Sequence, residues 1–398
     1  MVSDFAETKS LFQLPEGLVY LDGNSLGPLP KAAVARVSTM IRDEWGDMLI
    51  SGWNSAGWMN QPARVGDRIG KLIGGPAGTV VVGDTLSIKV YQALAAALEI
   101  NAGRKIILSD TGNFPSDLYM TEGLIKSLDK GHRLKLCAPE AVADYLTEDV
   151  AVLLLTEVDY KTGRLHDMHD LTRKAHAKGI LTIWDLAHSA GALPVDVSAA
   201  EADFAVGCTY KYLNSGPGGP AFIYLAPRLA NQVRPALSGW LGHEQPFAFD
   251  LEYRPGPGIE RMRVGTPPII QLAALEASLD IWDLVDMNDV RTKSSELSDL
   301  FIELVESGCP DLQLASPRDS RQRGSQVSFH FEHGHAAVKA MIDMGLIGDF
   351  RAPDIMRFGL TPLYIDAQDV NKAASIIEEV MAKRLWDNAE YFVQSTVT

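Results

Sequence analysis

The amino-acid sequence predicts an α/β protein: a large domain built on a mostly parallel sheet flanked by helices, and a smaller α/β domain after it. Continuous apolar runs alternate with amphipathic helical segments through most of the chain, as in a parallel sheet covered on both faces. The pattern changes near Thr266-Pro267-Pro268, where longer helices begin. A chain of 398 residues is also too long for one small core.

The composition is that of a globular protein with an excess of negative charge. Hydrophobic residues make up 46% of the chain, charged residues 22%, and the formal net charge is −15 at pH 7. Such a charge repels nucleic acids and anionic membranes, so we expect neither as a partner. No apolar run approaches the ~18 residues that a membrane helix needs.

The cysteines and the first residues indicate a cytoplasmic protein. Cys137, Cys208 and Cys309 are odd in number and widely separated, which fits a reducing compartment without a disulfide framework. The stretch Met1–Glu7 has neither the basic start nor the apolar centre of a secretory signal.

Three divisions of the chain are predicted. Residues 1–50 form an amino-terminal segment that packs with the small domain, residues 51–264 the large domain, and residues 265–398 the small carboxy-terminal domain. Within the first division, a short strand and turn occupy residues 18–29, and a helix with proline at its first position occupies residues 30–48.

The large domain is predicted to alternate strands with helices. β-Branched or continuous apolar runs mark the strands, and helical spacing of apolar residues marks the helices. The predicted strands are 79–83, 105–109, 134–137, 150–156, 181–185 and 204–206, and the helices are 86–98, 117–128, 139–146 and 171–178.

The small domain is predicted by the same criteria. Its helices are 269–285, 290–306, 336–344 and 370–383, and its strands are 312–314, 326–331 and 355–360.

One lysine is presented by a loop rich in glycine and proline. The strand at 204–206 leads into Lys211, and the loop 215–220 that follows can neither continue a strand nor start a helix. The preceding strand ends on Asp185, about one crossover earlier, so both side chains would enter one crevice. Pyridoxal phosphate enzymes need this pair, a lysine for the Schiff base and an aspartate for the pyridinium nitrogen. If only one of the two residues were present, the simpler interpretation would be favoured: a lysine on the surface, or an aspartate that caps a helix.

Two strand-to-helix junctions are candidate ligand sites. At residues 84–87 a helix start offers free N–H groups, and Ser87 adds a hydroxyl, which suits a phosphate, although many such junctions bind nothing. The glycine fingerprints of nucleotide sites are absent. At residues 113–117, Phe114 could stack on a flat ring, and Ser116 or Asp117 would cap the helix.

Two other features have a less specific pattern. The histidine clusters at 166–169 and 330–335 lack HExxH spacing and cysteine pairs, so no metal site is expected. Cys309 could be the nucleophile of a desulfurase, but a turn that ends a helix is the favoured interpretation.

Seven separate motifs resemble the bacterial kynureninases, a family in the aspartate aminotransferase superfamily of pyridoxal phosphate enzymes (fold type I). The similarity covers almost the whole chain. The motifs are YLDGNSLG (20–27), FPSD (114–117), WDLAHSAG (184–191), GCTYKY (207–212), GW (239–240), GTPP (265–268) and RFGLTPLY (357–364).

This resemblance implies pyridoxal 5'-phosphate as the cofactor. Lys211 would bind it and move the Cα proton, Tyr210 would relay protons, and Asp185 would pair with the pyridine nitrogen. A homodimer with shared active sites is implied, with two of the contacts, Trp240 and Thr266, reaching across it. The further implied cofactor-binding residues are Leu86, Ser87, Phe114, Pro115, Ser116, Asp117, Thr156, His188, Tyr210, Lys211, Trp240 and Thr266.

The resemblance also implies the substrate and the reaction. Hydrolysis of the Cβ–Cγ bond of L-kynurenine would release anthranilate and L-alanine in tryptophan degradation, on the route to NAD. Arg357 would bind the α-carboxylate, and Trp53 and Gly265 would line the aryl end. Because Gly265 cannot hydrogen-bond a ring hydroxyl, we expect L-kynurenine to be a better substrate than 3-hydroxykynurenine.

Three other functions remain open. The nearest is another fold type I enzyme, such as a cysteine desulfurase, an aminotransferase or an amino-acid epimerase. A non-catalytic protein that kept the fold would not need Lys211, Asp185 and Arg357 together. A nucleotide-binding α/β protein is disfavoured by the missing glycine fingerprints.

Overall fold

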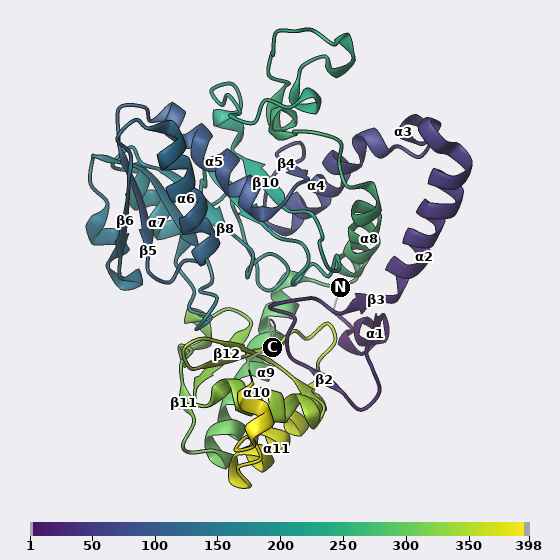
Figure 1. Ribbon diagram of the computed structural model, residues 1–398, viewed down its shortest axis with the longest axis vertical. Coiled ribbons are helices and arrows are strands. Elements are labelled where there is room, and N and C mark those ends of the chain that lie inside the picture. The colour runs from purple at the N-terminus through teal and green to yellow at the C-terminus, as the bar shows by residue number, and fades with distance from the viewer. Residues whose placement is uncertain (1–2, 394–398) are drawn as a thin grey trace.

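The computed structural model describes residues 3–393, which form a seven-stranded and a four-stranded sheet with their helices, and two further two-stranded pairs (Figure 1). The larger sheet confirms the predicted α/β class. Strands β9, β8, β7, β5 and β6 run parallel to one another, and β10 is antiparallel to both β9 and β4. In spatial order the strands are β4 (Val80–Val82), β10 (Phe222–Leu225), β9 (Phe204–Gly207), β8 (Leu181–Asp185), β7 (Val150–Thr156), β5 (Ile106–Asp110) and β6 (Arg133–Cys137).

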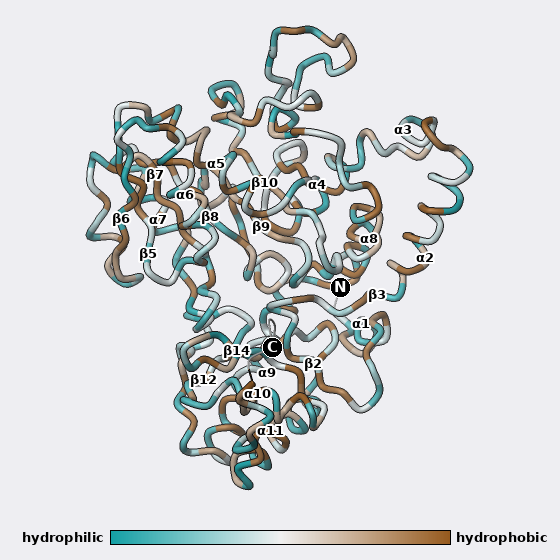
Figure 2. The backbone as a smooth tube through the Cα atoms, in the orientation of Figure 1, coloured by the Kyte–Doolittle hydropathy of each residue, from teal (hydrophilic) through white to brown (hydrophobic). Residues whose placement is uncertain are grey.

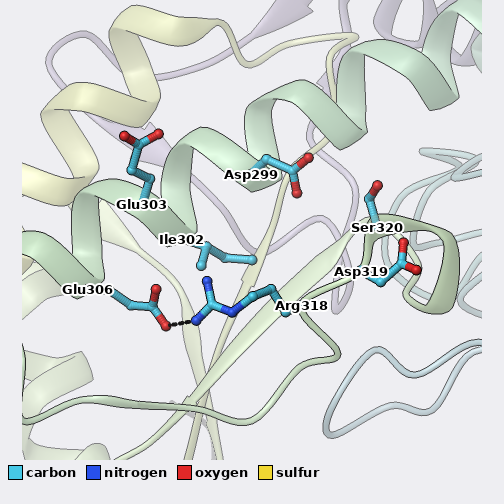
Figure 3. A pocket seen from close by; sticks show the side chains of 7 residues that line it. All are labelled: Asp299, Ile302, Glu303, Glu306, Arg318, Asp319 and Ser320. Atoms are coloured by element: carbon cyan, nitrogen blue, oxygen red, sulfur yellow. Dashed lines mark hydrogen bonds and ion pairs between the residues drawn. The ribbon is translucent and has the colours of Figure 1, made fainter.

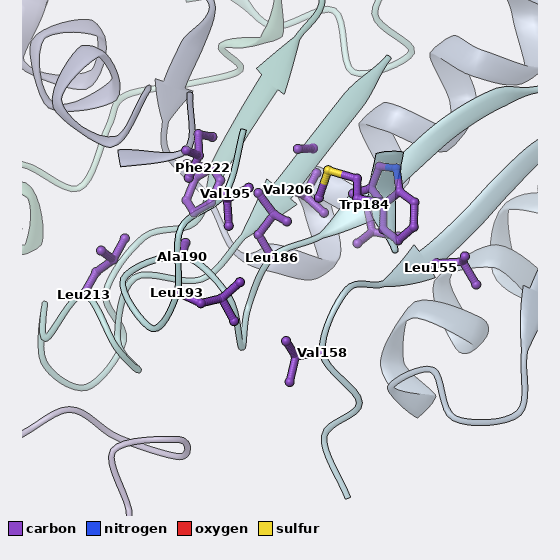
Figure 4. Close-up of a cluster of buried hydrophobic side chains, with 14 of the residues drawn as sticks. Leu155, Val158, Trp184, Leu186, Ala190, Leu193, Val195, Val206, Leu213 and Phe222 are labelled. Atoms are coloured by element: carbon purple, nitrogen blue, oxygen red, sulfur yellow. The ribbon is translucent and has the colours of Figure 1, made fainter. Parts of the chain in front are cut away.

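Apolar side chains from neighbouring strands of this sheet form the core. Every residue of β7 is buried, which explains its unbroken apolar run. Figure 4 shows Trp184 of β8, Val206 of β9 and Phe222 of β10 within one buried cluster. The helices of this part are α4 (Gln61–Leu72), α5 (Leu86–Ile100), α6 (Pro115–Leu128), α7 (Met168–His176) and α8 (Ile269–Leu279).

The smaller sheet lies in the lower half of Figure 1 and is antiparallel throughout. Its order is β11 (Gln313–Leu314), β12 (Gln326–His330), β15 (Ile355–Gly359) and β14 (Asp349–Arg351). Helices α9 (Met287–Gly308), α10 (Gly334–Asp343) and α11 (Ala367–Ala382) accompany it. The predicted division of the chain at residues 50 and 264 stays a prediction. Residues 1–2 of its first part and residues 394–398 of its last part lie outside the described residues.

The amino-terminal segment contacts the small sheet's part of the molecule. Strand β2 (Val19–Tyr20) pairs in parallel with β13 (Leu346–Ile347), more than 300 residues later in the chain. Helix α1 (Phe5–Ser10) precedes the antiparallel pair of β1 (Phe12–Gln13) and β3 (Leu29–Pro30).

A long helical arm follows β3 and stands at the side of the molecule (Figure 1). It consists of α2 (Lys31–Thr39) and a π-helical continuation, Met40–Asp47. The prediction that Pro30 opens this helix was wrong by one position: Pro30 has an extended ψ of 130° and is the residue before the helix. Figure 2 shows apolar stretches on α2 although the arm is peripheral.

Several helix ends differ from the sequence prediction. Helix α6 begins at Pro115, after Phe114 in an extended conformation, so Ser116 and Asp117 lie inside its first turn and do not cap it. Proline at the first helical position sets this start, because its fixed φ is already helical. Helix α8 ends at Leu279 and continues as a 3-10 turn to Leu284 instead of reaching residue 285 as one helix.

Short helices complete the connections. They are the α-helical turn α3 (Gly52–Ser55) and the 3-10 helices Leu49–Ser51, Trp58–Asn60, Pro139–Tyr145, Pro227–Leu229, Trp240–Gly242, Pro246–Ala248, Gly258–Met262, Asp280–Leu284, Ser320–Gln322 and Ala389–Phe392. Within residues 3–393, no helix combines the length and the apolar character needed to cross a membrane.

Candidate functional site

The site forms at the carboxyl ends of β8 and β9. Asp185 is the last residue of β8, and it lies opposite Val206 in β9. Lys211 follows four residues after β9 ends. The prediction that these two strand ends are neighbours is therefore confirmed, and the crevice beyond parallel strand ends is the usual ligand position in such sheets.

The Lys211 amine faces a neutral imidazole. Its Nζ lies 3.0 Å from Nε2 of His188 and 5.8 Å from the ring centres of both Phe114 and Tyr210. Burial, and then the charge of Lys211, lower the pKa of His188 well below its usual value. The other ring nitrogen, Nδ1, is buried without a partner among the described residues.

Two buried carboxyl groups lie within the electrostatic reach of this amine. Asp185 accepts a hydrogen bond from the backbone N–H of Ala187 at 2.8 Å. Burial raises the pKa of Asp185 to about 6, while the charge of Lys211 opposes the rise. Burial, and then the charge of Asp185, also raise the pKa of Asp117, whose Oδ2 is buried without a partner among the described residues. The pocket therefore holds acceptors that a bound cation or N–H group would satisfy.

A hydrogen-bonded chain behind Asp185 holds β5 and β7 in register. Thr156 donates to Oδ1 of Asn113 at 2.5 Å, and Asn113 donates to Ser109 Oγ at 2.9 Å. Asn113 Oδ1 also accepts from the backbone N–H of Phe114 at 2.7 Å. Asn113, which the sequence analysis did not single out, thus holds the backbone of Phe114.

Two helix starts meet beside this group. The Oγ atoms of Ser87 in α5 and Ser116 in α6 lie 3.0 Å apart. Neither helix has a side-chain cap. In α6 Pro115 has no N–H and the Asp117 N–H donates to the Phe114 carbonyl at 3.0 Å, so the start of α5 offers the more open N–H groups to an anion. Asp84, at φ +58°, makes the left-handed turn that takes the chain from β4 into α5.

The amino-terminal segment holds the lysine loop from outside. Gly27 donates its N–H to the carbonyl of Tyr210 at 2.8 Å. A Cβ at Gly27 would overlap the carbonyl oxygen of Lys211 and the side chain of Asn214. Only glycine fits this close approach, which explains the last residue of the motif at 20–27.

Arg357 lies in β15 and is bound by groups of its own chain. Its Nε and Nη2 donate to the two oxygens of Asp349 at 2.6 and 2.5 Å, and both side chains are 2% exposed. The guanidinium also donates to the carbonyl of Tyr160 at 2.5 Å and to Ser25 Oγ at 3.0 Å. Tyr160 packs edge-on against Phe114, with 5.1 Å between ring centres, so this arginine adjoins the lysine pocket.

A second arginine shares these partners. Arg351, in the neighbouring strand β14, lies 2.7 Å from Asp349 Oδ2 and 3.2 Å from Ser25 Oγ. Although burial disfavours the ionised form of Asp349, the hydrogen bonds and charge of Arg357, and then Arg351, hold its pKa below the usual value. Burial, and then the charge of Asp349, raise the pKa of the adjacent Asp22 to about 7.

Four of the expected site residues lie on other segments. Trp53 packs edge-on against Trp58 at 5.7 Å, and Trp240 packs against Phe247 at 5.6 Å. Gly265 and Thr266 are exposed and follow Val264 in the chain. The Val264 carbonyl accepts a hydrogen bond from the N–H of Leu241, so this segment lies beside the turn that contains Trp240. Among the described residues, no hydrogen bond joins any of these four to Lys211.

Sequence reasoning missed Asp349, Arg351 and Asn113. The first two alternate with Phe350 in a three-residue strand too short to be recognised, whereas Arg357 stands in a longer predicted strand. The signal that could have found them is an Asp-x-Arg sequence, Asp349 to Arg351, whose arginine stands six residues before Arg357 in the predicted strand.

One surface cavity and one histidine–aspartate pair lie apart from this site. A surface cavity of about 480 Å³ between α9 and the segment at 318–320 is lined mainly by carboxylates (Figure 3), and Arg318 there bonds to Glu306. His166 bonds to Asp110 at 2.6 Å. In residues 3–393, no group of three or more His, Cys, Asp or Glu side chains has the arrangement of a metal site.

Cys309 does not have the surroundings of a nucleophile. It is buried at the end of α9, and burial raises the pKa of its thiol to about 11. At neutral pH such a thiol stays protonated and unreactive. The helix-ending interpretation of Cys309 is therefore the one that the structure favours.

Comparison with known proteins identifies relatives over the full chain. The model of the kynureninase C-terminal domain matches residues 290–377. A kynureninase of Pseudomonas fluorescens is 49% identical over 99% of this chain and 96% of its own. A kynureninase of Burkholderia pseudomallei (strain 1106a) is 46% identical with the same coverage.

Solved structures with lower identity share the fold. The apo structure of a cysteine desulfurase from Thermococcus onnurineus NA1 has a TM-score of 0.81 and 18% identity, covering 96% of this chain and 100% of that one. A mutant of C-DES with glycine covalently linked to its PLP cofactor has a TM-score of 0.80 and 17% identity, covering 94% and 99%.

Proposed function

The chain belongs to the kynureninase family, and on that premise we propose how its residues carry out the family's reaction. The protein is a pyridoxal phosphate-dependent hydrolase that cleaves the Cβ–Cγ bond of L-kynurenine to anthranilate and L-alanine. The relatives at 49% and 46% identity over nearly the whole chain support this activity. The observation that supports the residue roles is the placement of Lys211 and the buried Asp185 at adjoining strand ends.

The residues of the pocket fit the cofactor. Its pyridinium N–H would satisfy the buried Asp185 carboxylate, and its anionic phosphate would use the uncapped N–H groups of α5 and α6 with Ser87 and Ser116. Nδ1 of His188 and Oδ2 of Asp117 are buried without a partner among the described residues, so each could hydrogen-bond to a bound cofactor. We assign the ring faces to Phe114 and His188. Leu86, Pro115 and Thr156 supply the surrounding backbone and hydroxyl contacts.

When bound, this cofactor supplies an electron sink for the bonds of the attached amino acid. Lys211 then moves the proton at Cα, because its Nζ is the amine at the centre of the pocket. His188 stays neutral and can accept a hydrogen bond from that amine without competing for its charge. Burial raises the pKa of the Tyr210 hydroxyl, so Tyr210 keeps its proton and can donate it to the substrate.

Arg357 is our candidate for holding the α-carboxylate. A guanidinium presents a planar fork that matches a carboxylate, and Asp349 fixes its orientation. At the other end of the substrate we assign the aryl ring to Trp53 and Gly265. Gly265 has open space where a side chain would be. A ring hydroxyl would lose its water there without a new partner, so we expect about a tenfold preference for L-kynurenine over 3-hydroxykynurenine.

The remaining assignments concern assembly and location. We propose a homodimer in which the partner's copy of the Trp240 and Thr266 segments completes the phosphate site. Exposed aromatic rings support this: Phe247 lies 5.6 Å from Trp240 and 6.3 Å from Phe249, all on one projecting segment. We also propose the cytoplasm as the location, supported by three separate free cysteines.

The experiment that tests this function is direct. The purified protein loaded with pyridoxal phosphate is incubated with L-kynurenine, and anthranilate is followed by fluorescence while L-alanine is quantified. We expect both products in equal amounts, and none from Lys211→Ala, which should keep the parent's melting temperature. Absence of anthranilate with the parent protein, or equal turnover by the variant, would contradict the proposal.

A further inference from the structure

Arg357 has little free hydrogen-bonding capacity. Four of its five N–H groups donate to Asp349, Ser25 and the Tyr160 carbonyl. A substrate carboxylate bound in the bidentate mode needs two donors on one edge. Arg357 therefore needs a second group to complete the carboxylate site, unless one of its present bonds is broken.

Arg351 has the free capacity that Arg357 lacks. Its side chain is 34% exposed, and its bonds within residues 3–393 go to the Phe350 carbonyl, Ser25 Oγ and Asp349. Its Nε and one Nη1 hydrogen have no partner in that part of the chain. An exposed guanidinium with open donors can receive a carboxylate without losing a contact.

The guanidinium groups of Arg351 and Arg357 lie side by side against the same two side chains. Both lie within 3.2 Å of Ser25 Oγ, and both pair with Asp349 Oδ2. Their charges, after burial and Lys211, lower the pKa of His188, which touches the Lys211 amine. Arg351, like Arg357, is thus within electrostatic range of the lysine pocket.

The charges around this position leave an excess of positive charge. Arg351 and Arg357 face one ionised carboxylate, Asp349. Asp22 also faces them, and below its pKa of about 7 it is largely protonated and neutral. One further anion would balance the cluster, and an amino-acid carboxylate has that charge.

We propose that Arg351 is a second substrate-binding residue, which takes the α-carboxylate together with Arg357 while Asp349 and Ser25 hold the two guanidinium groups side by side. This proposal rests on the function proposed above and adds a residue to its substrate site. Asp349 is then a positioning residue, because it acts through both arginines.

The test compares ligands that differ only in the carboxylate. L-Alanine and L-alaninamide are titrated into the cofactor-loaded parent and Arg351→Met by calorimetry, and Michaelis constants are measured for L-kynurenine and its α-amide. We expect Arg351→Met to weaken both carboxylate ligands at least tenfold and both amides less than twofold. Arg321→Met removes the same charge from a surface site where, within residues 3–393, the guanidinium pairs with Asp319, and it should change none of these values.

The outcomes separate the alternatives. Equal weakening of carboxylates and amides would show that Arg351 only supports the local structure, and no weakening would show that it is not involved; either result overturns the proposal. If Arg351→Met does not fold, Arg351→Lys keeps the charge beside Asp349 and should still weaken the carboxylates severalfold without affecting the amides. Formation of anthranilate by the parent tests the proposed function separately, so failure of one does not imply failure of the other.

Discussion

At the scale of single residues, Arg357 and Asp349 of the smaller sheet carry opposite charges in a nearly dry space, while the neighbouring Arg351 is 34% exposed. Arg357 and Asp349 form a bidentate pair in which each side chain is 2% exposed. Removing one partner of such a pair leaves an uncompensated buried charge, which costs more than the pair itself contributes. Substitutions here should therefore affect both substrate binding and stability.

Arg357→Lys is expected to lower kcat/KM for L-kynurenine at least tenfold, or about 1.4 kcal/mol. A lysine keeps the charge but cannot bond to both Asp349 oxygens and the Tyr160 carbonyl in one plane. Steady-state kinetics and a melting curve check this, with Arg321→Lys as the surface control. Kinetics equal to those of the parent would place the carboxylate contact on another residue.

The pH dependence of substrate binding should depend on Asp22. Its pKa is raised to about 7 by burial and by Asp349, and lowered in part by Arg357 and Arg351; Ser25, Tyr20, Tyr212 and Tyr364 are its other polar or titratable neighbours. Below pH 7 Asp22 is neutral and leaves the arginines free for the substrate. Above pH 7 it ionises and competes for them, so the Michaelis constant should rise as pH rises.

Asp22→Asn tests this pH dependence because asparagine cannot ionise. If ionised Asp22 excludes the substrate, we expect the Michaelis constant of the parent to rise about 25-fold between pH 6.5 and 8.5, since one proton with a pKa of about 7 is involved, and this rise should be lost in the variant. Titration of the substrate itself is common to both proteins and cancels in the comparison. Parallel pH profiles for the two proteins would exclude Asp22 as the titrating group.

At the scale of elements, close backbone contacts place the strands and helices that carry the site. Helix α4 lies against β4 through Gly66, where a Cβ would overlap the Val80 carbonyl. Strand β4 leads directly into the turn at Asp84 and the start of α5, so this contact also supports the anion-binding helix end.

Gly66→Ala should destabilise the protein by about 1–3 kcal/mol, because the added methyl group must displace the β4 backbone. Gly123→Ala is the matched control: this glycine lies within α6 with open space around it, and alanine there should stabilise by about 0.5–1 kcal/mol. Chemical unfolding of both variants measures the difference. A Gly66→Ala variant as stable as the parent would show that α4 can shift away from β4 freely.

At the scale of the whole molecule, the helical arm exposes several large apolar side chains to solvent. Val34, Trp45, Leu49 and Ile50 are 54–80% exposed along α2 and the turns after it. Apolar side chains gathered on one peripheral arm are typical of a protein–protein contact. This arm supports the homodimer that we propose for the active protein.

Light scattering should therefore give about twice the chain mass of 43.3 kDa. The double substitution Trp45→Glu with Ile50→Glu should shift the protein toward monomer and lower its activity, since the shared phosphate contacts would be lost. Leu385→Glu, an exposed site beyond α11, should change neither property. A parent protein that is monomeric and fully active would contradict the dimer.

The sequence by itself determined the alternation of strands and helices in the large domain and the position of Lys211 and Asp185 at neighbouring strand ends. Apolar periodicity and turn residues act within one element, so β7, β8 and β9 and their ends could be read locally. The sequence also indicated Phe114, Ser87 and Arg357, through motifs that stand at helix starts or in a strand.

Only the tertiary structure decided which distant segments meet. Ser25 reaches Asp349 and Arg357 from more than 320 residues away, Gly27 supports the lysine loop, and β10 enters the sheet antiparallel. The short strand β14 was missed for a related reason, whereas α4 was missed although its buried residues Val65, Gly66, Ile69 and Gly70 repeat at helical spacing. Contacts across elements depend on sheet topology and on close packing of complementary surfaces, and neither leaves a periodic signal in the local sequence.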